Sequence, residues 1–220
     1  GLTDARPSAT ADGQGIQPLD RYGLKVMSMG FMMKADDAVI WRGPMLGKAL
    51  QQFIEDVDWG ELDYLILDMP PGTGDVQLSL SQLLPVAGAV VVTTPQDVAF
   101  ADVRRAIKMF HTTRTPILGL VENMSHFTCG SCGTDHHIFG DGRIAEQAAA
   151  EGVDILGKLP LDSVTAVAAD QGQPIVVAAP DSDISRAYRD LAKVIARRLA
   201  LRVVETAKPA FGDFFQMKSS

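Results

Sequence analysis

The two cysteines of the sequence, Cys129 and Cys132, form a C-x-x-C pair whose sulfurs could bind a soft metal. Thiolate sulfur prefers zinc or an iron–sulfur cluster to Mg2+ or Ca2+. A glycine follows each cysteine, and glycine leaves the backbone free to wrap around an ion. The residues alone therefore predict a metal site, and they leave an iron–sulfur cluster and zinc equally open.

Each possible occupant of the pair needs a different set of partners. A [4Fe–4S] cluster is held by four Cys thiolates, so two copies of this chain would have to share one cluster across a two-fold axis. Zinc could be bound within one chain by both cysteines and two of His126, His136 and His137. A thioredoxin-like dithiol is a third hypothesis, although such pairs begin a helix and this pair lies between glycines. Two unliganded cysteines in a surface loop are the fourth.

A second candidate site follows the apolar run Tyr64–Leu67, which ends in Asp68 and continues into a turn rich in proline and glycine. A carboxylate at the end of a buried strand lies where open α/β sheets bind their ligands. In phosphate-transfer enzymes such an Asp helps to hold Mg2+, while the glycines let backbone N–H groups approach a phosphate. An Asp that only caps a turn is the alternative.

The segment Gly43–Ala49 imitates a phosphate-binding loop without matching it. That loop requires G-x-x-x-x-G-K followed by Ser or Thr, whose hydroxyl reaches Mg2+. This segment has three residues between its glycines and an alanine after Lys48. We therefore interpret Lys48 as a residue on the surface of a helix.

Apolar runs alternate along the chain with segments in which apolar residues recur at helical spacing. The predicted strands cover residues 24–31, 64–68, 87–94, 116–122 and 153–159. The predicted helices cover residues 45–57, 76–84, 97–111, 144–150 and 184–204, with Asp97 placed to cap the third of them. Strands that are apolar on both faces and joined through helices predict an α/β fold with a doubly wound, mostly parallel sheet.

Around this α/β domain, which we expect to span residues 24–204, the ends of the chain lack sustained periodicity. Residues 1–23 are rich in Gly, Pro, Asp, Ala and Thr and are predicted to be an irregular lead-in. Residues 205–220 are predicted to be a tail.

Composition excludes several classes of protein. An apolar content of 46% with 21% charged residues is that of a globular chain, not of a disordered or collagenous one. The net charge of -7 argues against nucleic acid or a membrane surface as a partner. Because no apolar run approaches the roughly 18 residues of a membrane helix and no signal region is present, we expect a cytoplasmic protein.

Several longer blocks occur in a fixed order between about residues 20 and 200: Gly23–Phe31, Val39–Met45, Trp59–Asp75, Thr93–Ala106, Gly119–Ser125, the C-x-x-C pair and Pro160–Asp162. Together these blocks resemble the Mrp/ApbC family of ATP-binding iron–sulfur cluster carriers. That family lies within the deviant P-loop ATPases, which include MinD.

The resemblance implies a P-loop NTPase-like fold and a role for each matching residue. Asp68 matches the Mg2+-associated catalytic acid, and Gly72 matches the turn near the γ-phosphate of ATP. Asn123 matches the asparagine that reads adenine, and Pro160 and Asp162 would lie beside the base. From spacing alone, an Asn after a strand is more typical of a turn.

The resemblance also implies what the cysteines do. Carriers of this family hold a labile [4Fe–4S] cluster between the C-x-x-C pairs of a homodimer and transfer it to apo iron–sulfur proteins. Cys129 and Cys132 would then be its ligands, with ATP and Mg2+ as further cofactors. The family's lysine-bearing phosphate loop belongs before the first residue of this sequence. The resemblance thus implies an N-terminally truncated domain that does not hydrolyse ATP alone.

The cysteine pair and the ATPase-like blocks leave two other functions open. One is a zinc-stabilised interaction module in which the ATPase fold is vestigial. The other is a MinD-like regulatory ATPase, against which the cysteine pair argues because a partitioning switch does not need a soft-metal site.

Overall fold

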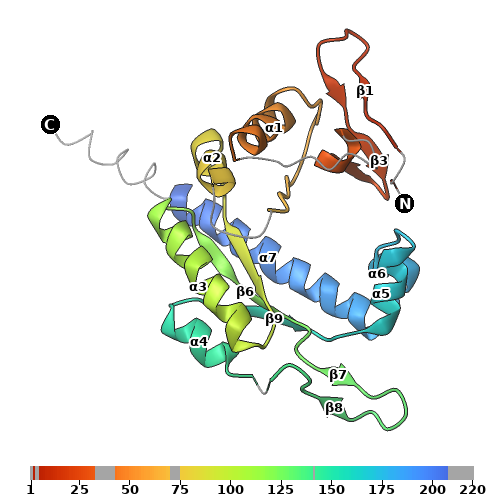
Figure 1. Ribbon diagram of the computed structural model, residues 1–220, viewed down its shortest axis with the longest axis vertical. Coiled ribbons are helices and arrows are strands. Elements are labelled where there is room, and N and C mark those ends of the chain that lie inside the picture. Colours follow the sequence, from red (N-terminus) through yellow and green to blue (C-terminus); the bar gives the residue numbers. More distant parts are fainter. Residues whose placement is uncertain (1, 3–4, 33–42, 70–74, 141, 208–220) are drawn as a thin grey trace, which may run out of the picture. The chain divides into compact units, whose positions relative to one another are not determined.

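Figure 1 shows the protein as a computed structural model, which describes residues 2, 5–32, 43–69, 75–140 and 142–207. The chain divides into two compact units, Gly1–Pro85 and Val86–Ser220. None of the helices in the described ranges combines the length and the apolar character that crossing a membrane requires.

The described part of the Gly1–Pro85 unit contains two small hairpins, a 3-10 helix and two α-helices. Its elements are β1 (Ser8–Ala9), β2 (Ile16–Gln17), β3 (Leu19–Arg21), β4 (Leu24–Val26), the 3-10 helix η1 (Met29–Met32), α1 (Gly43–Glu55) and α2 (Asp75–Leu83). Strand β1 pairs antiparallel with β2, and β3 pairs antiparallel with β4. The predicted helices over residues 45–57 and 76–84 are confirmed, and α1 packs against α2.

Two predictions for the start of the chain differ from the structure. Residues 1–23, expected to be irregular, contain β1, β2 and β3. The strand predicted over residues 24–31 is only β4, which turns back onto β3 through Tyr22 and Gly23. Both turn residues have positive φ, 53° and 76°, which is the requirement of a two-residue hairpin turn. A local turn therefore took the place of the predicted parallel pairing.

The prediction of a strand over Tyr64–Asp68 is wrong. The described residues from Gly60 to Met69 include no strand, and the side chain of Ile66 is 88% exposed. A strand exists only where a neighbouring strand accepts and donates its backbone hydrogen bonds. This run pairs with none of the described strands, so its apolar character alone does not make it one.

The Val86–Ser220 unit contains a parallel sheet of three strands in the order β5-β6-β9. Its elements are β5 (Ala89–Thr93), α3 (Asp97–Thr112), β6 (Ile117–Asn123), β7 (Phe127–Thr128), β8 (Asp135–His136), α4 (Ile144–Ala150), β9 (Ile155–Leu159), α5 (Ser163–Asp170), α6 (Ile175–Ala178) and α7 (Asp183–Ala207). The strands and helices predicted after residue 86 are confirmed. Helices α5 and α6 were not predicted, and α6 has only four residues, which is too few for a helical period.

Helices cover both faces of this sheet, as Figure 1 shows for α3 and α4 on one side and α7 on the other. Neighbouring residues of β6 serve opposite faces. Leu120 packs with Phe100 and Ile107 of α3, whereas Val121 packs with the cluster that includes Ile184 of α7. Because β6 is buried on both sides, its sequence is apolar without alternation. The predicted α/β fold with a parallel sheet is confirmed.

The predicted cap of α3 is wrong in detail. The N-cap position is Gln96, which makes no side-chain cap bond. Asp97 instead receives hydrogen bonds from Arg143 and from Gln147, at 2.8 Å for the latter, and so joins α3 to α4. A partner distant in the sequence competed with the local cap and bound the carboxylate.

Candidate functional site

The carboxyl ends of the three parallel strands form one edge of the Val86–Ser220 unit. Strand register places Asn123 at the end of β6 opposite Leu159 at the end of β9. Pro160 follows directly, so the structure brings Asn123 and Pro160 to the same edge, where parallel sheets bind ligands. The family resemblance implies a base-binding site at this position.

Asn123 is engaged in a turn and still has donor capacity. Its Oδ1 accepts a hydrogen bond from the backbone N–H of Met124 at 3.0 Å, and Met124 has a φ of 54°. This bond fits the turn interpretation of Asn123, which spacing alone favours. In the described structure no hydrogen bond uses the side-chain amide nitrogen of Asn123, so this group can donate to a ligand.

Asp162 has a structural task at the beginning of α5. Its Oδ2 accepts from the backbone N–H of Thr165 at 2.6 Å and from the hydroxyl of Thr165 at 2.7 Å. Asp162 is the N-cap of α5, with the extended backbone that this position requires. The carboxylate is thus already bonded on the protein side before any ligand is considered.

We expect Asp162→Ala to lower the free energy of unfolding by about 1 kcal/mol, since the first turn of α5 loses its acceptor. Urea unfolding followed by circular dichroism measures this change. Asp162→Asn keeps a cap oxygen and should stay within a few tenths of a kcal/mol of the original protein. Equal stability of the alanine variant would contradict the capping role.

The residues predicted to bind Mg2+ and the γ-phosphate belong to the other unit. Asp68 is an exposed residue of the Gly1–Pro85 unit, and Gly72 lies outside the described residues. Lys48 is exposed on α1, which confirms its interpretation as a helix-surface residue.

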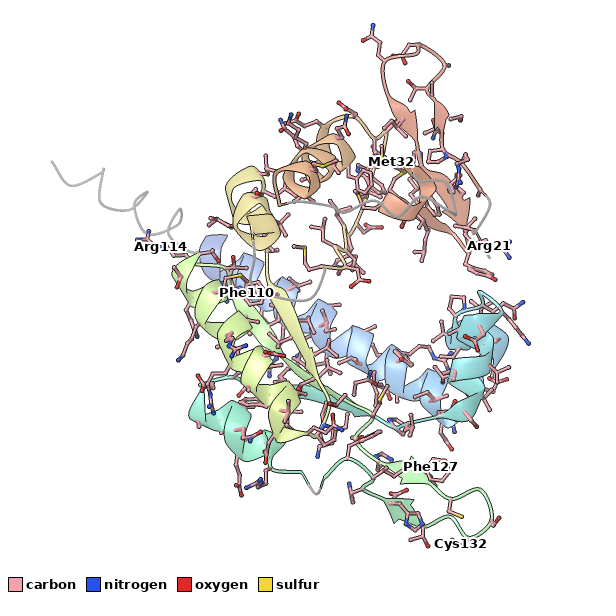
Figure 2. All side chains as sticks on the ribbon, viewed as in Figure 1. Arg21, Met32, Phe110, Arg114, Phe127 and Cys132 are labelled. Atoms are coloured by element: carbon pink, nitrogen blue, oxygen red, sulfur yellow. The ribbon has the colours of Figure 1, made fainter. Side chains whose placement is uncertain are left out.

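The two cysteines lie in a hairpin that periodicity did not reveal. Strand β7 pairs with β8, and the hydroxyl of Thr128 donates to the Asp135 carboxylate at 2.6 Å. The turn closes through Cys129 N–H to the Thr134 carbonyl at 2.9 Å. Figure 2 shows Cys132 at the end of this hairpin that is farthest from the sheet. The feature of the sequence that could have predicted this hairpin is its Gly-rich turn between two short segments.

Both sulfurs are accessible, because Cys129 is half-buried and Cys132 is exposed. The thiol of Cys132 lies 3.3 Å from the hydroxyl of Thr134. Hydrogen bonding by the Thr134 side chain, then by its backbone and then by Cys129, lowers the pKa of the Cys132 thiol from its ordinary value. The thiolate is the form that binds metals, so the pair is suited to a soft metal held at the protein surface.

The histidines do not complete a metal site with the cysteines. His126 and His137 direct their Nδ1 atoms to Ser125, at 2.9 Å from its hydroxyl and 3.1 Å from its carbonyl oxygen. Among the residues that the structure describes, no group of three or more His, Cys, Asp or Glu side chains could hold a metal ion. The described residues thus do not bring together the four zinc ligands that were predicted as an alternative.

Sequence reasoning missed a buried ion pair at the same edge of the sheet. Glu122 is 1% exposed, and its Oε2 lies 3.0 Å from Nζ of Lys158 on β9. The feature of the sequence that could have predicted this pair is Glu122, a charged residue inside a largely apolar strand. A carboxylate this deeply buried requires the neighbouring cation, because an uncompensated charge would cost several kcal/mol.

Residues 1–196 match the protein family described as ParA, NUBPL iron-transfer P-loop NTPase. The chain is 49% identical over 191 residues to the iron–sulfur cluster carrier protein of Aquifex aeolicus, covering 86% of this chain and 52% of that protein. It is 48% identical over 184 residues to the iron–sulfur cluster transfer protein NUBPL of Dictyostelium discoideum, covering 84% and 57%. The chain thus spans a little over half the length of these relatives.

Solved structures agree with these matches. The nucleotide-binding protein from Archaeoglobus fulgidus, in complex with ADP, superposes with a TM-score of 0.67 at 35% identity, covering 83% of this chain and 70% of that one. The cell division ATPase MinD of Pyrococcus furiosus gives a TM-score of 0.50 at 21% identity, covering 71% and 59%. The likeness to MinD is one of fold alone.

Proposed function

Since the chain belongs to the ParA family of NUBPL-type iron-transfer P-loop NTPases, we propose that it carries an iron–sulfur cluster and transfers it to apo iron–sulfur proteins. The observation that carries the proposal is the accessible pair of sulfurs, Cys129 and Cys132, at the end of the β7–β8 hairpin. A surface position suits a cargo that must leave the protein, whereas a structural metal is enclosed by its ligands.

The cluster is a [4Fe–4S] cluster shared by two copies of the chain. Each copy supplies two thiolates, and the cluster takes four. A two-fold axis through the cluster makes the two hairpins meet as equivalent partners. Ligands that belong to different protomers separate when the protomers shift, so the cluster can be released without unfolding either hairpin.

The carboxyl edge of the sheet binds ATP with Mg2+. The side-chain amide of Asn123 donates to the adenine edge, and Pro160 and Asp162 lie beside the base. For Asp68 and Gly72 we propose the roles of the family positions that they match, which are Mg2+ binding and the turn near the γ-phosphate. Support comes from the matching blocks of sequence and from the Archaeoglobus protein, which was solved with ADP.

Anaerobic reconstitution with iron and sulfide tests the carrier function. We expect about four iron and four sulfide per dimer, together with a shift from monomer to dimer in size-exclusion chromatography. Mixing the loaded protein with an apo-ferredoxin should restore the ferredoxin spectrum. One zinc per chain without sulfide would contradict the proposal and favour a zinc-stabilised interaction module.

We expect Asn123→Ala to weaken ADP binding by about tenfold and to reduce the preference for ADP over GDP, because the base loses a donor in its plane. Isothermal titration with both nucleotides measures this effect. Asn123→Asp serves as the matched control: it keeps the acceptor for the Met124 N–H but has no amide donor. If Asn123→Asp binds ADP as tightly as the original protein, the amide does not read the base.

A further inference from the structure

The cysteine hairpin is joined to the sheet through one buried residue, Ser125. Ser125 is 2% exposed and lies directly before the hairpin. Its backbone N–H and its hydroxyl both donate to the carbonyl oxygen of Leu159, at 2.9 Å and 3.1 Å. The chain leaving β6 is thereby fixed to the last residue of β9.

A histidine from each end of the hairpin binds this same serine. His126 precedes β7 and His137 follows β8. A carbonyl oxygen only accepts, so Nδ1 of His137 carries the proton in its 3.1 Å bond to Ser125 O. Nδ1 of His126 lies 2.9 Å from Oγ of Ser125, in a bond whose donor depends on the tautomer of the ring.

The two ends of the hairpin are attached differently. The end at His126 is held by the backbone as well, because its carbonyl oxygen accepts from Leu161 N–H at 2.7 Å. At the other end the bond is made by a side chain. In the described structure, Nδ1 of His137 binds the carbonyl oxygen of Ser125, which lies 12 residues earlier in the sequence. The bonds nearer the tip, such as Thr128 to Asp135, are internal to the hairpin. The direction of the tip is therefore determined at its base.

We propose that His137 is a positioning residue for cluster binding: its bond to Ser125 sets the direction in which the hairpin presents Cys129 and Cys132. This inference rests on the carrier function proposed above. Without the bond the returning arm of the hairpin pivots about His126, and the four thiolates of a dimer converge less often. Cluster release then becomes faster although every ligand is still present.

The contact also lies next to the proposed nucleotide edge. Ser125 follows Asn123 by two residues, and Leu159 directly precedes Pro160. A ligand that orders this edge also orders the anchor of the hairpin, which is the pair of bonds from Ser125 to Leu159. ADP should therefore slow cluster release. That effect should shrink when the bond from His137 is removed.

Two variants separate the hydrogen bond from the bulk of the ring. His137→Ala removes the donor. His137→Asn keeps one, because its amide nitrogen is the same number of bonds from the backbone as Nδ1 of histidine. His136→Ala is the matched control: His136 is the adjacent exposed histidine on β8, and the described structure shows no side-chain hydrogen bond for it.

The experiment measures iron release from the reconstituted full chain to a chromogenic chelator, with and without ADP, and backbone 15N relaxation of Cys129 and Cys132 in the cluster-free protein. We expect His137→Ala to release iron about fivefold faster, to show a more mobile hairpin and to respond less to ADP. His137→Asn and His136→Ala should behave like the original protein in all three measurements.

The inference is overturned if His137→Ala matches the original protein, if His137→Asn fails to restore slow release, or if His136→Ala releases iron equally fast. A failure of the proposed function looks different. In that case the original protein takes up no cluster, and both proposals fall together. If it does load and only the variants are indistinguishable, the positioning role alone is lost.

Discussion

Replacing Cys129 and Cys132 together by serine should abolish cluster binding, from about four iron and four sulfide per dimer to none. Serine oxygen is a hard and weakly acidic donor, and it does not replace a thiolate toward iron or zinc. In this structure no further His, Cys, Asp or Glu among the described residues completes a metal site that could compensate. Iron and sulfide analysis after anaerobic reconstitution measures the loss, and size-exclusion chromatography measures the accompanying loss of the dimer.

The matched control for this prediction lies between the two cysteines. Ser131→Ala removes an exposed hydroxyl of the same turn and leaves both sulfurs in place, so it should load as the original protein does. The double serine variant should also retain its unfolding free energy, because neither sulfur is fully buried. Retention of iron and sulfide by the double variant would show that the cysteines are not the ligands.

Gly119→Ala should destabilise the Val86–Ser220 unit by about 3–5 kcal/mol, which is a large part of the stability of an ordinary domain. Gly119 has a φ of 149°, which side chains rarely adopt. A Cβ there would lie 2.6 Å from Cγ of Leu156 and 2.7 Å from the carbonyl oxygen of Asp154. Relief would require β9 to move away from β6. Urea unfolding monitored by circular dichroism measures the change.

Gly130→Ala provides the comparison for this substitution. Nothing lies within 4 Å of the Cβ that it would add, so the same methyl group should change stability by less than about 0.5 kcal/mol. If Gly119→Ala is as well tolerated as Gly130→Ala, the close approach of β6 to β9 at this position is not present in solution.

Elements that depend on local pattern could be predicted from the sequence. The apolar runs of β5, β6 and β9 and the helical spacing of α3, α4 and α7 predicted an α/β unit, and the structure confirms it. The type and spacing of Cys129 and Cys132 predicted soft-metal chemistry in the same way. Periodicity and donor chemistry belong to residues close together in the chain, so no knowledge of the fold was needed to see them.

Contacts between residues that are distant in the sequence could not be predicted in this way. The run Tyr64–Asp68 looks like a strand yet pairs with none of the described strands, and Asp97 binds α4 instead of capping α3. The anchor of the cysteine hairpin joins Ser125 to Leu159, 34 residues apart. A hydrogen bond or a strand pairing needs a partner at the correct distance and direction, and partners so far apart in sequence are brought together only by folding.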